Sequence, residues 1–214
     1  MIFTFYSYKG GVGRSMALAN VAEYCSQSNL DVLIVDWDLE APGIERFFFT
    51  DPESYIDHVG LIDMLLDYKK IMSDKKEIDE DFLLNLPSAK NYLLNVYPPS
   101  NSTGQISLLL AGRRSKNHFS NYTESVINFD WKDFYDNWEG EIYFDQLREQ
   151  FSSIADVVLI DSRTGITEMG GVCTYQLADN IIMFCGMNDQ NIDGTFNMAR
   201  NFSSEELKRL RLGW

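Results

Sequence analysis

Residues 8–15 combine glycines, two cations and a hydroxyl, which are the residue types that bind a phosphate chain. The run reads Tyr-Lys-Gly-Gly-Val-Gly-Arg-Ser. Glycines allow several backbone N–H groups to point at one ligand, and the N-terminus of a following helix adds its dipole. Arg14 supplies a cation for the phosphates, and Ser15 supplies a hydroxyl for Mg²⁺. We therefore predict a nucleotide-binding loop made of Gly10, Gly11, Val12, Gly13, Arg14, Ser15 and Met16.

The alternative for this loop is a glycine-rich turn without a ligand. In a chain of average composition, a chance match to Lys-Gly-Gly-x-Gly-[Lys/Arg]-[Ser/Thr] is on the order of one in ten thousand. The loop also lies between a β-type apolar run, 2–7, and an amphipathic run, 15–28. A strand before the motif and a helix after it are the context in which such loops bind phosphate, so ligand binding is favoured.

Acidic residues follow other apolar runs at two places. Asp36 ends the run 31–36 and Asp38 lies two residues later, while Asp161 follows the run 155–160. Hydrolysis of a phosphate by in-line attack needs a positioned water and a metal ion that neutralises the phosphate charge. Carboxylates at the corner between a strand and a helix can serve both needs. The alternative is that these acids only cap the adjoining elements.

The spacing of apolar residues predicts the elements that hold these side chains. Strand 2–7, helix 15–28 and strand 31–36 form a βαβ unit, which is typical of a parallel sheet. Further predictions are a helix over 59–72, strands over 91–96, 105–111, 155–160 and 179–185, helices within 117–152 with a break near 139–140, and loops at 73–81 and 98–104. The sequence thus predicts an α/β fold with a doubly wound, mainly parallel sheet and a site at the carboxyl ends of its strands.

The run 7–20 resembles the deviant Walker A loop of the MinD/ParA family, in a variant with arginine at the last basic position. The resemblance implies the P-loop NTPase fold, with ATP and Mg²⁺ as ligands. It also implies a role for Lys9, because the early lysine of that family reaches across a dimer to the phosphates on the partner's nucleotide. An ATP-sandwich homodimer is therefore expected. Adenine as the base is implied by the resemblance alone.

Two further runs resemble the switch regions of that family. Residues 35–43 resemble the first switch, which implies that Asp36 holds a Mg²⁺-bound water and that Asp38 orients or activates the attacking water. Residues 159–165 resemble the Walker B strand and second switch, which implies that Asp161 holds another Mg²⁺-bound water. The expected catalytic residues are then Lys9 and Asp38, and the expected metal-site residues are Ser15, Asp36 and Asp161.

Arginine at position 14 leaves two functions open. Arginine keeps the charge of the usual lysine but changes its shape and reach, so the rate of hydrolysis is in question. The first function is an ATP-driven switch with slow Mg²⁺-dependent hydrolysis that recruits a protein partner. The second is a regulatory module that binds nucleotide with little or no turnover. A tyrosine or small-molecule phosphotransferase ranks below both.

Composition limits the setting of the protein. The chain has 214 residues and a formal net charge of −14, and a strongly acidic surface disfavours binding to nucleic acid. We treat 1–214 as a single nucleotide-binding domain, either compact or part of a longer architecture. The chain contains no apolar run of the ~20 residues that a membrane helix needs and no signal-peptide pattern. The three cysteines are few and widely spaced, which indicates reduced thiols. We expect a cytoplasmic protein.

Several charged residues keep two interpretations. For Arg163, a structural or switch ion pair is favoured over catalysis, because a guanidinium fits a carboxylate well. For the cluster Arg113, Arg114 and Lys116, a solvated loop is favoured over contact with a nucleotide or partner. The basic, leucine-rich tail 205–214 is expected to form a docked or frayed helix rather than a membrane anchor.

Overall fold

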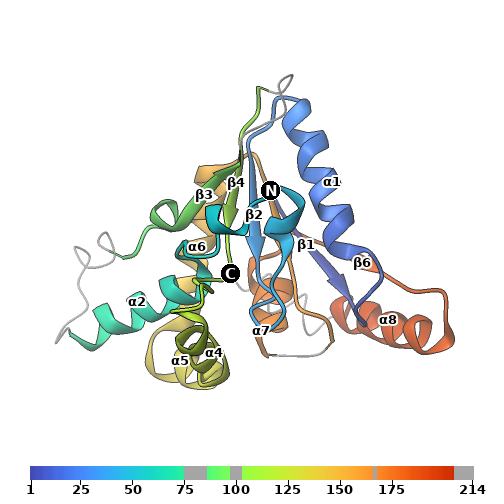
Figure 1. Ribbon diagram of the computed structural model, residues 1–214. Coiled ribbons are helices and arrows are strands. Elements are labelled where there is room, and N and C mark those ends of the chain that lie inside the picture. Colours follow the sequence, from blue (N-terminus) through green and yellow to red (C-terminus); the bar gives the residue numbers. More distant parts are fainter. Residues whose placement is uncertain (75–85, 97–102, 166–167, 205–214) are drawn as a thin grey trace.

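Six strands form one sheet in the order β3-β4-β2-β5-β1-β6 (Figure 1). The computed structural model describes residues 1–74, 86–96, 103–165 and 168–204. The strands are β1 (Ile2–Ser7), β2 (Val32–Asp36), β3 (Leu93–Val96), β4 (Ile106–Leu109), β5 (Val157–Asp161) and β6 (Asn180–Phe184). All are parallel except β3, which runs antiparallel to β4 at one edge. The predicted mainly parallel sheet is confirmed.

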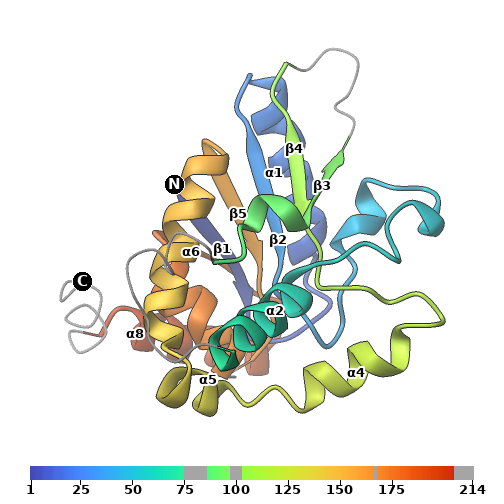
Figure 2. The same ribbon diagram turned by 90° about the vertical axis from the view of Figure 1, so that its left-hand side faces the viewer.

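Helices cover both faces of this sheet, as a doubly wound fold requires (Figure 2). The α-helices are α1 (Arg14–Gln27), α2 (Leu61–Ser73), α4 (Phe119–Ile127), α5 (Trp131–Asn137), α6 (Gly140–Ile154), α7 (Glu168–Gly171) and α8 (Asp189–Phe202). Shorter turns are η1 (Ile44–Phe47), η2 (Pro52–Ser54), η3 (Ala89–Tyr92) and the π-helical η4 (Val172–Leu177). None of the described helices is both long and apolar enough to cross a membrane.

Strand β2 shows how the sheet separates two hydrophobic cores. Successive side chains of a strand point to opposite faces. Val32 and Ile34 accordingly pack into the core beneath α1, and Leu33 and Val35 pack into the larger core beneath α2 and α6. Every residue of β2 is buried, so an uninterrupted apolar run, rather than an alternating one, is what this central strand needs.

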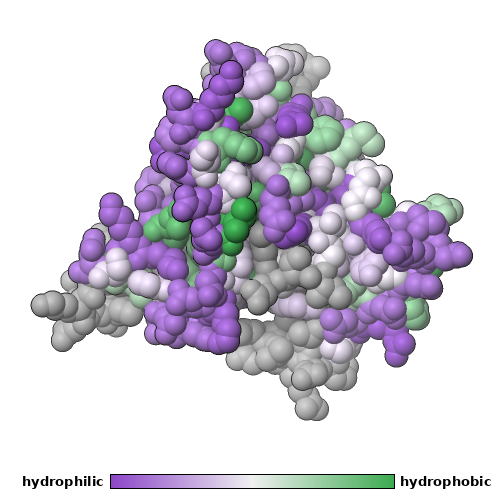
Figure 3. All heavy atoms as spheres, turned by 60° about the horizontal axis from the view of Figure 1, so that its bottom comes forward, coloured by the Kyte–Doolittle hydropathy of each residue, from purple (hydrophilic) through white to green (hydrophobic). Residues whose placement is uncertain are grey.

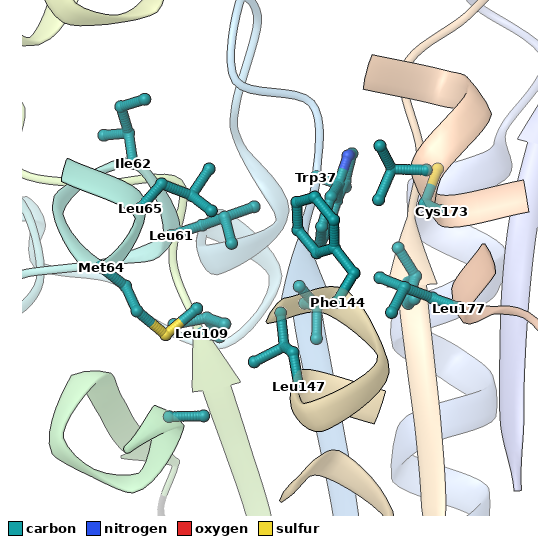
Figure 4. Close-up of a cluster of buried hydrophobic side chains, with 14 of the residues drawn as sticks. Trp37, Leu61, Ile62, Met64, Leu65, Leu109, Phe144, Leu147, Cys173 and Leu177 are labelled. Atoms are coloured by element: carbon teal, nitrogen blue, oxygen red, sulfur yellow. The ribbon is translucent and has the colours of Figure 1, made fainter. Parts of the chain in front are cut away.

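The larger core is rich in aromatic side chains, and it begins directly beside the first acidic loop. Trp37 is fully buried one residue after β2, and its ring centroid lies 6.0 Å from that of Phe144 in α6 (Figure 4). Phe144 also contacts the rings of Phe134 and Tyr143. The start of the loop 37–43 is therefore fixed by packing.

Truncation of Phe144 should test this packing. Phe144→Ala removes a side chain with no exposed surface, and we expect a loss of about 4 kcal/mol in the free energy of unfolding because the cavity cannot close fully. Denaturant unfolding measures it. Phe119→Ala is the matched control, since Phe119 is 58% exposed and its truncation should cost under about 0.5 kcal/mol. Equal losses for the two variants would contradict the packing described.

The strands and helices that were predicted agree with the structure apart from small shifts at element ends and one missed break, but neither η4 nor the 14-residue helix α8 is among the elements predicted from the sequence. The expected break near 139–140 separates α5 from α6, but a second break at 128–130 divides α4 from α5. There, the Asp130 carboxylate accepts a hydrogen bond from the backbone N–H of Asp133 and starts a new helix. Most of the predicted loop 73–81, much of 98–104 and the tail 205–214 lie outside the described residues.

Candidate nucleotide site

The glycine loop joins the end of β1 to the start of α1 and leaves an open cradle. Gly11 and Gly13 have φ angles of 77° and 82°, a region that residues with a side chain rarely adopt. A Cβ added at Gly11 would meet no atom within 4 Å, and one at Gly10 would meet only Thr164, at 4.0 Å. The first turn of α1 has no side-chain cap, so its backbone N–H groups are available to an anion. These features fit a phosphate chain.

Helix α8 packs against the start of the loop and limits its movement. A Cβ added at Gly194 of α8 would lie 2.2 Å from the ring of Tyr8, so only glycine permits this approach. A Cβ at Gly186 would lie 3.1 Å from Asn191 of α8 and 3.4 Å from Val12 of the loop. Neither glycine could be predicted from local sequence patterns, because Tyr8 and Val12 lie far from them in the chain.

Register brings the predicted acids to one edge of the sheet. Asp36 ends β2, Asp161 ends β5, and the two are paired in the parallel ladder. Both are buried, at 0% and 3% exposure. Ser15 makes a side-chain hydrogen bond to Asp161. Two carboxylates and a hydroxyl are hard oxygen donors, which Mg²⁺ prefers, so this donor set fits the metal that the resemblance implies.

The two buried acids differ in what holds them. The Asp36 carboxylate accepts backbone hydrogen bonds from Asp38 (3.2 Å) and Gly43 (3.1 Å), so it shapes the loop that follows it. Burial, then the charges of Asp161 and Glu45, raise the pKa of Asp36 well above its ordinary value. Burial also raises the pKa of Asp161, which Arg14 and Ser15 partly oppose. A cation that enters the site would therefore stabilise the charged forms of these two carboxylates.

In the structure, Arg14 turns toward the acids. Its Nε lies 2.6 Å from the Asp161 carboxylate and its Nη2 lies 3.5 Å from that of Asp38. Its Nη1 donates to Ser7 Oγ at 3.3 Å. The side chain is only 8% exposed. The structure thus brings Arg14 together with both Asp38 and Asp161, a contact that the sequence did not reveal.

The remaining predicted residues lie at the open side of the loop. Met16 is 55% exposed, and Lys9 and Val12 are partly exposed. Lys9 has no ion-pair partner among the residues that the structure describes. Viewed from below, the molecule shows hydrophilic residues mainly around the margins of this face, together with less polar ones (Figure 3). A free cation at such a face is available for a ligand or a second chain.

The two acidic loops are tied to each other. Arg163 forms an ion pair with Glu40, and the backbone N–H of Trp37 donates to the carbonyl of Asp161 at 3.0 Å. The ion pair favoured for Arg163 is therefore present. Glu40 belongs to the loop after β2 and Arg163 to the loop after β5, so a movement of one loop would displace the other.

Arg114 contradicts the prediction of a solvated loop. Strand β4 is parallel to β2, so the residues after it lie at the same edge of the sheet as Asp36. Arg114 reaches from there to Glu45 of η1 at 3.1 Å, and the side chains are 10% and 1% exposed. Arg113 is half-exposed and 3.6 Å from Asp63, and Lys116 is exposed, so the prediction holds only for Lys116. The missed signal was an acid, Glu45, inside the apolar run 44–49.

Removal of Arg114 should destabilise the fold, because it leaves the buried Glu45 carboxylate without a counter-charge. We expect Arg114→Met to lower the free energy of unfolding by about 3 kcal/mol. The double variant Arg114→Met/Glu45→Gln should recover part of this loss, since it leaves no unpaired carboxylate. Denaturant unfolding of wild type, the double variant and the two single variants Arg114→Met and Glu45→Gln gives the coupling. Strictly additive losses would show that the pair does not interact.

Comparison with solved structures shows that MinD and ParA ATPases and tyrosine kinase domains have a similar fold. MinD from Pyrococcus horikoshii OT3, solved with Mg-ADP, aligns with a TM-score of 0.59 and 16% identity over 94% of this chain and 63% of its own. A ParA family ATPase from Chlorobium tepidum TLS gives 0.60 and 16% over 95% and 69%. The BceF tyrosine kinase domain gives 0.52 and 17% over 95% and 65%.

These comparisons confirm the predicted resemblance at the level of the fold. The chain spans about two thirds of the length of these structures. No protein-family model and no curated protein sequence matches it. Since ATPases and kinase domains share the fold, the activity has to be argued from the residues of the site.

Proposed function

We propose that this protein is an ATP-binding molecular switch that hydrolyses ATP slowly with Mg²⁺ and forms an ATP-sandwich dimer that recruits a protein partner. One observation carries the proposal: an open glycine loop faces a pair of buried carboxylates, Asp36 and Asp161, which are aligned by the register of β2 and β5. A phosphate chain would supply the negative charge for the loop amides, and its Mg²⁺ would supply the positive charge for the two carboxylates. We also propose that residues 1–214 act as one nucleotide-binding unit in the cytoplasm.

Each predicted residue has a role in this proposal. The loop amides and Arg14 bind the phosphates. The Ser15 hydroxyl would bind Mg²⁺, Asp36 and Asp161 would each hold a Mg²⁺-bound water, and the metal would neutralise phosphate charge. Asp38 lies at the edge of the site with its side chain 15% exposed, where it can orient the attacking water.

Lys9 supports the dimer. Its side chain is partly exposed and lacks an ion-pair partner among the described residues, whereas Arg14 in the same loop is buried and paired. A cation left free at the mouth of a phosphate loop is suited to a nucleotide on a second chain. The trans contact would make dimerisation depend on ATP.

The alternative is a nucleotide-binding regulatory module with little or no hydrolysis. The contact between Arg14 and Asp38 favours this alternative, because a carboxylate that is paired with a guanidinium is less able to accept a hydrogen bond from the attacking water. A measured turnover number separates this alternative from the switch.

Binding of a fluorescent ATP analogue tests the proposal at its first step. We expect binding with Mg²⁺ that unlabelled ATP competes away. Gly10→Val should abolish it, because the new side chain fills the cradle. The position has room for a Cβ, and thermal unfolding should confirm that the variant folds. Equal binding by wild type and Gly10→Val would place the nucleotide elsewhere and contradict the proposal.

A further inference from the structure

We propose that Arg14 is an internal counter-cation that closes the site when no nucleotide is bound, and that Mg²⁺ must displace it from Asp161. The inference rests on the proposed function and adds a means of regulation to the same site. In it, the arginine of the phosphate loop has two alternating partners. These are the carboxylates of its own chain, and the phosphates of the ligand.

The geometry of Arg14 supports the first set of partners. The guanidinium reaches three side chains at once, with distances of 2.6 Å to Asp161, 3.3 Å to Ser7 and 3.5 Å to Asp38. Asp161 is 3% exposed, so it meets this cation almost without competing water. A charge-assisted contact of this kind is among the stronger ones in proteins.

The residue type matters as much as the charge. A guanidinium presents five donors in a planar fork, so it can satisfy Asp161, Asp38 and Ser7 together. A lysine at this position would bring a single ammonium, which cannot span all three. Arginine therefore makes the closed state more stable than lysine would.

The same carboxylate is needed by the metal. Asp161 is expected to hold a Mg²⁺-bound water, and its carboxylate interacts with Ser15, another of the three predicted metal-site residues. Arg14 Nε lies 2.6 Å from Asp161 Oδ1, so a Mg²⁺-bound water held by the same carboxylate would bring the charge of the metal close to the guanidinium, which it repels. Arg14 would therefore leave Asp161 when Mg²⁺ and nucleotide bind, and the phosphates would become its new partners.

Release of Arg14 would also free the loop after β2. Arg14 holds Asp38, and Arg163 holds Glu40, so two arginines fix this loop in the closed state. Loss of the Arg14 contact leaves Asp38 able to turn toward a water. The Arg14 side chain thus couples nucleotide binding to the release of Asp38, which can then orient a water.

Thermal unfolding with Mg²⁺ alone tests the counter-cation directly. Without nucleotide, about 10 mM Mg²⁺ should leave the melting temperature of wild type unchanged, because Arg14 already occupies the acids. In Arg14→Gln the same Mg²⁺ should raise it by about 3 °C. Arg148→Gln is the control, since it breaks a distant ion pair with Asp179 and should show no Mg²⁺ response. Equal responses of wild type and Arg14→Gln would overturn the proposal.

The association rate of nucleotide gives a second test with a variant that keeps the charge. Arg14→Lys should bind the fluorescent Mg-ATP analogue about tenfold faster than wild type, because a weaker contact is broken first. A lost phosphate contact would instead appear mainly in the dissociation rate. An association rate equal to or slower than that of wild type would overturn the proposal.

The two tests separate this inference from the proposed function. If neither wild type nor Arg14→Lys binds nucleotide, the proposed function fails, and the Mg²⁺ response of Arg14→Gln still decides whether Arg14 is a counter-cation. If wild type binds and hydrolyses ATP but Arg14→Gln shows no Mg²⁺ response, the counter-cation is overturned and the proposed function stands.

Discussion

Replacement of Asp38 by alanine should lower the steady-state release of phosphate from ATP by about a hundred- to ten-thousandfold. Asp38 is the most exposed of the three acids, with 15% of its side chain accessible, whereas Asp36 and Asp161 are buried. A group that positions the attacking water acts only in the chemical step. Affinity for Mg-ATP should therefore change little, and binding of the fluorescent analogue can be measured alongside turnover.

The control for this variant is Glu53→Ala, which removes an exposed acid in η2. It should leave turnover within about twofold of wild type, as surface substitutions away from a site usually do. If wild type turns over no faster than Asp38→Ala, the catalytic role is lost and the regulatory module becomes the better account.

Lys9→Ala should abolish the ATP-dependent association of two chains. In sedimentation experiments with Mg-ATP, wild type should move from its chain mass of 24.6 kDa toward about twice that value, and the variant should stay at the mass of one chain. The reason is that Lys9 is the loop cation left free for a partner's nucleotide. Because its contact is made in trans, binding of nucleotide to the isolated chain should survive.

Lys90→Ala is the matched control, since Lys90 is an exposed lysine of η3. Its removal changes the net charge by the same amount, so it should leave the shift in mass intact. Association of Lys9→Ala equal to that of wild type would exclude the trans contact. A loss of association in Lys90→Ala as well would indicate a general charge effect.

Local patterns were sufficient to predict the frame of this site. The loop 8–15, the strand ends at Asp36 and Asp161, and the βαβ order are features of short windows of sequence. The register of the parallel strands then follows from burial, since every apolar run has to lie inside the sheet. The carboxyl ends of these strands therefore lie at the same edge. The fold class and the edge that holds the acids could therefore be predicted before any coordinates.

The ion pairs of the site could not be predicted in the same way. Arg14 and Asp161 are 147 residues apart, and Glu45 and Arg114 are 69 apart, so only the tertiary fold brings them together. A motif reading assigns Arg14 to the phosphates because it considers the bound state. Without a ligand, the nearest uncompensated charges in a buried site are its own carboxylates, and the guanidinium turns to them.

Solution mass by light scattering, measured without nucleotide, with Mg-ADP and with Mg-ATP, tests the central claim most directly. The account predicts a single chain of 24.6 kDa in the first two conditions and a mass about twice as large with Mg-ATP. A mass that is the same in all three conditions would contradict the switch.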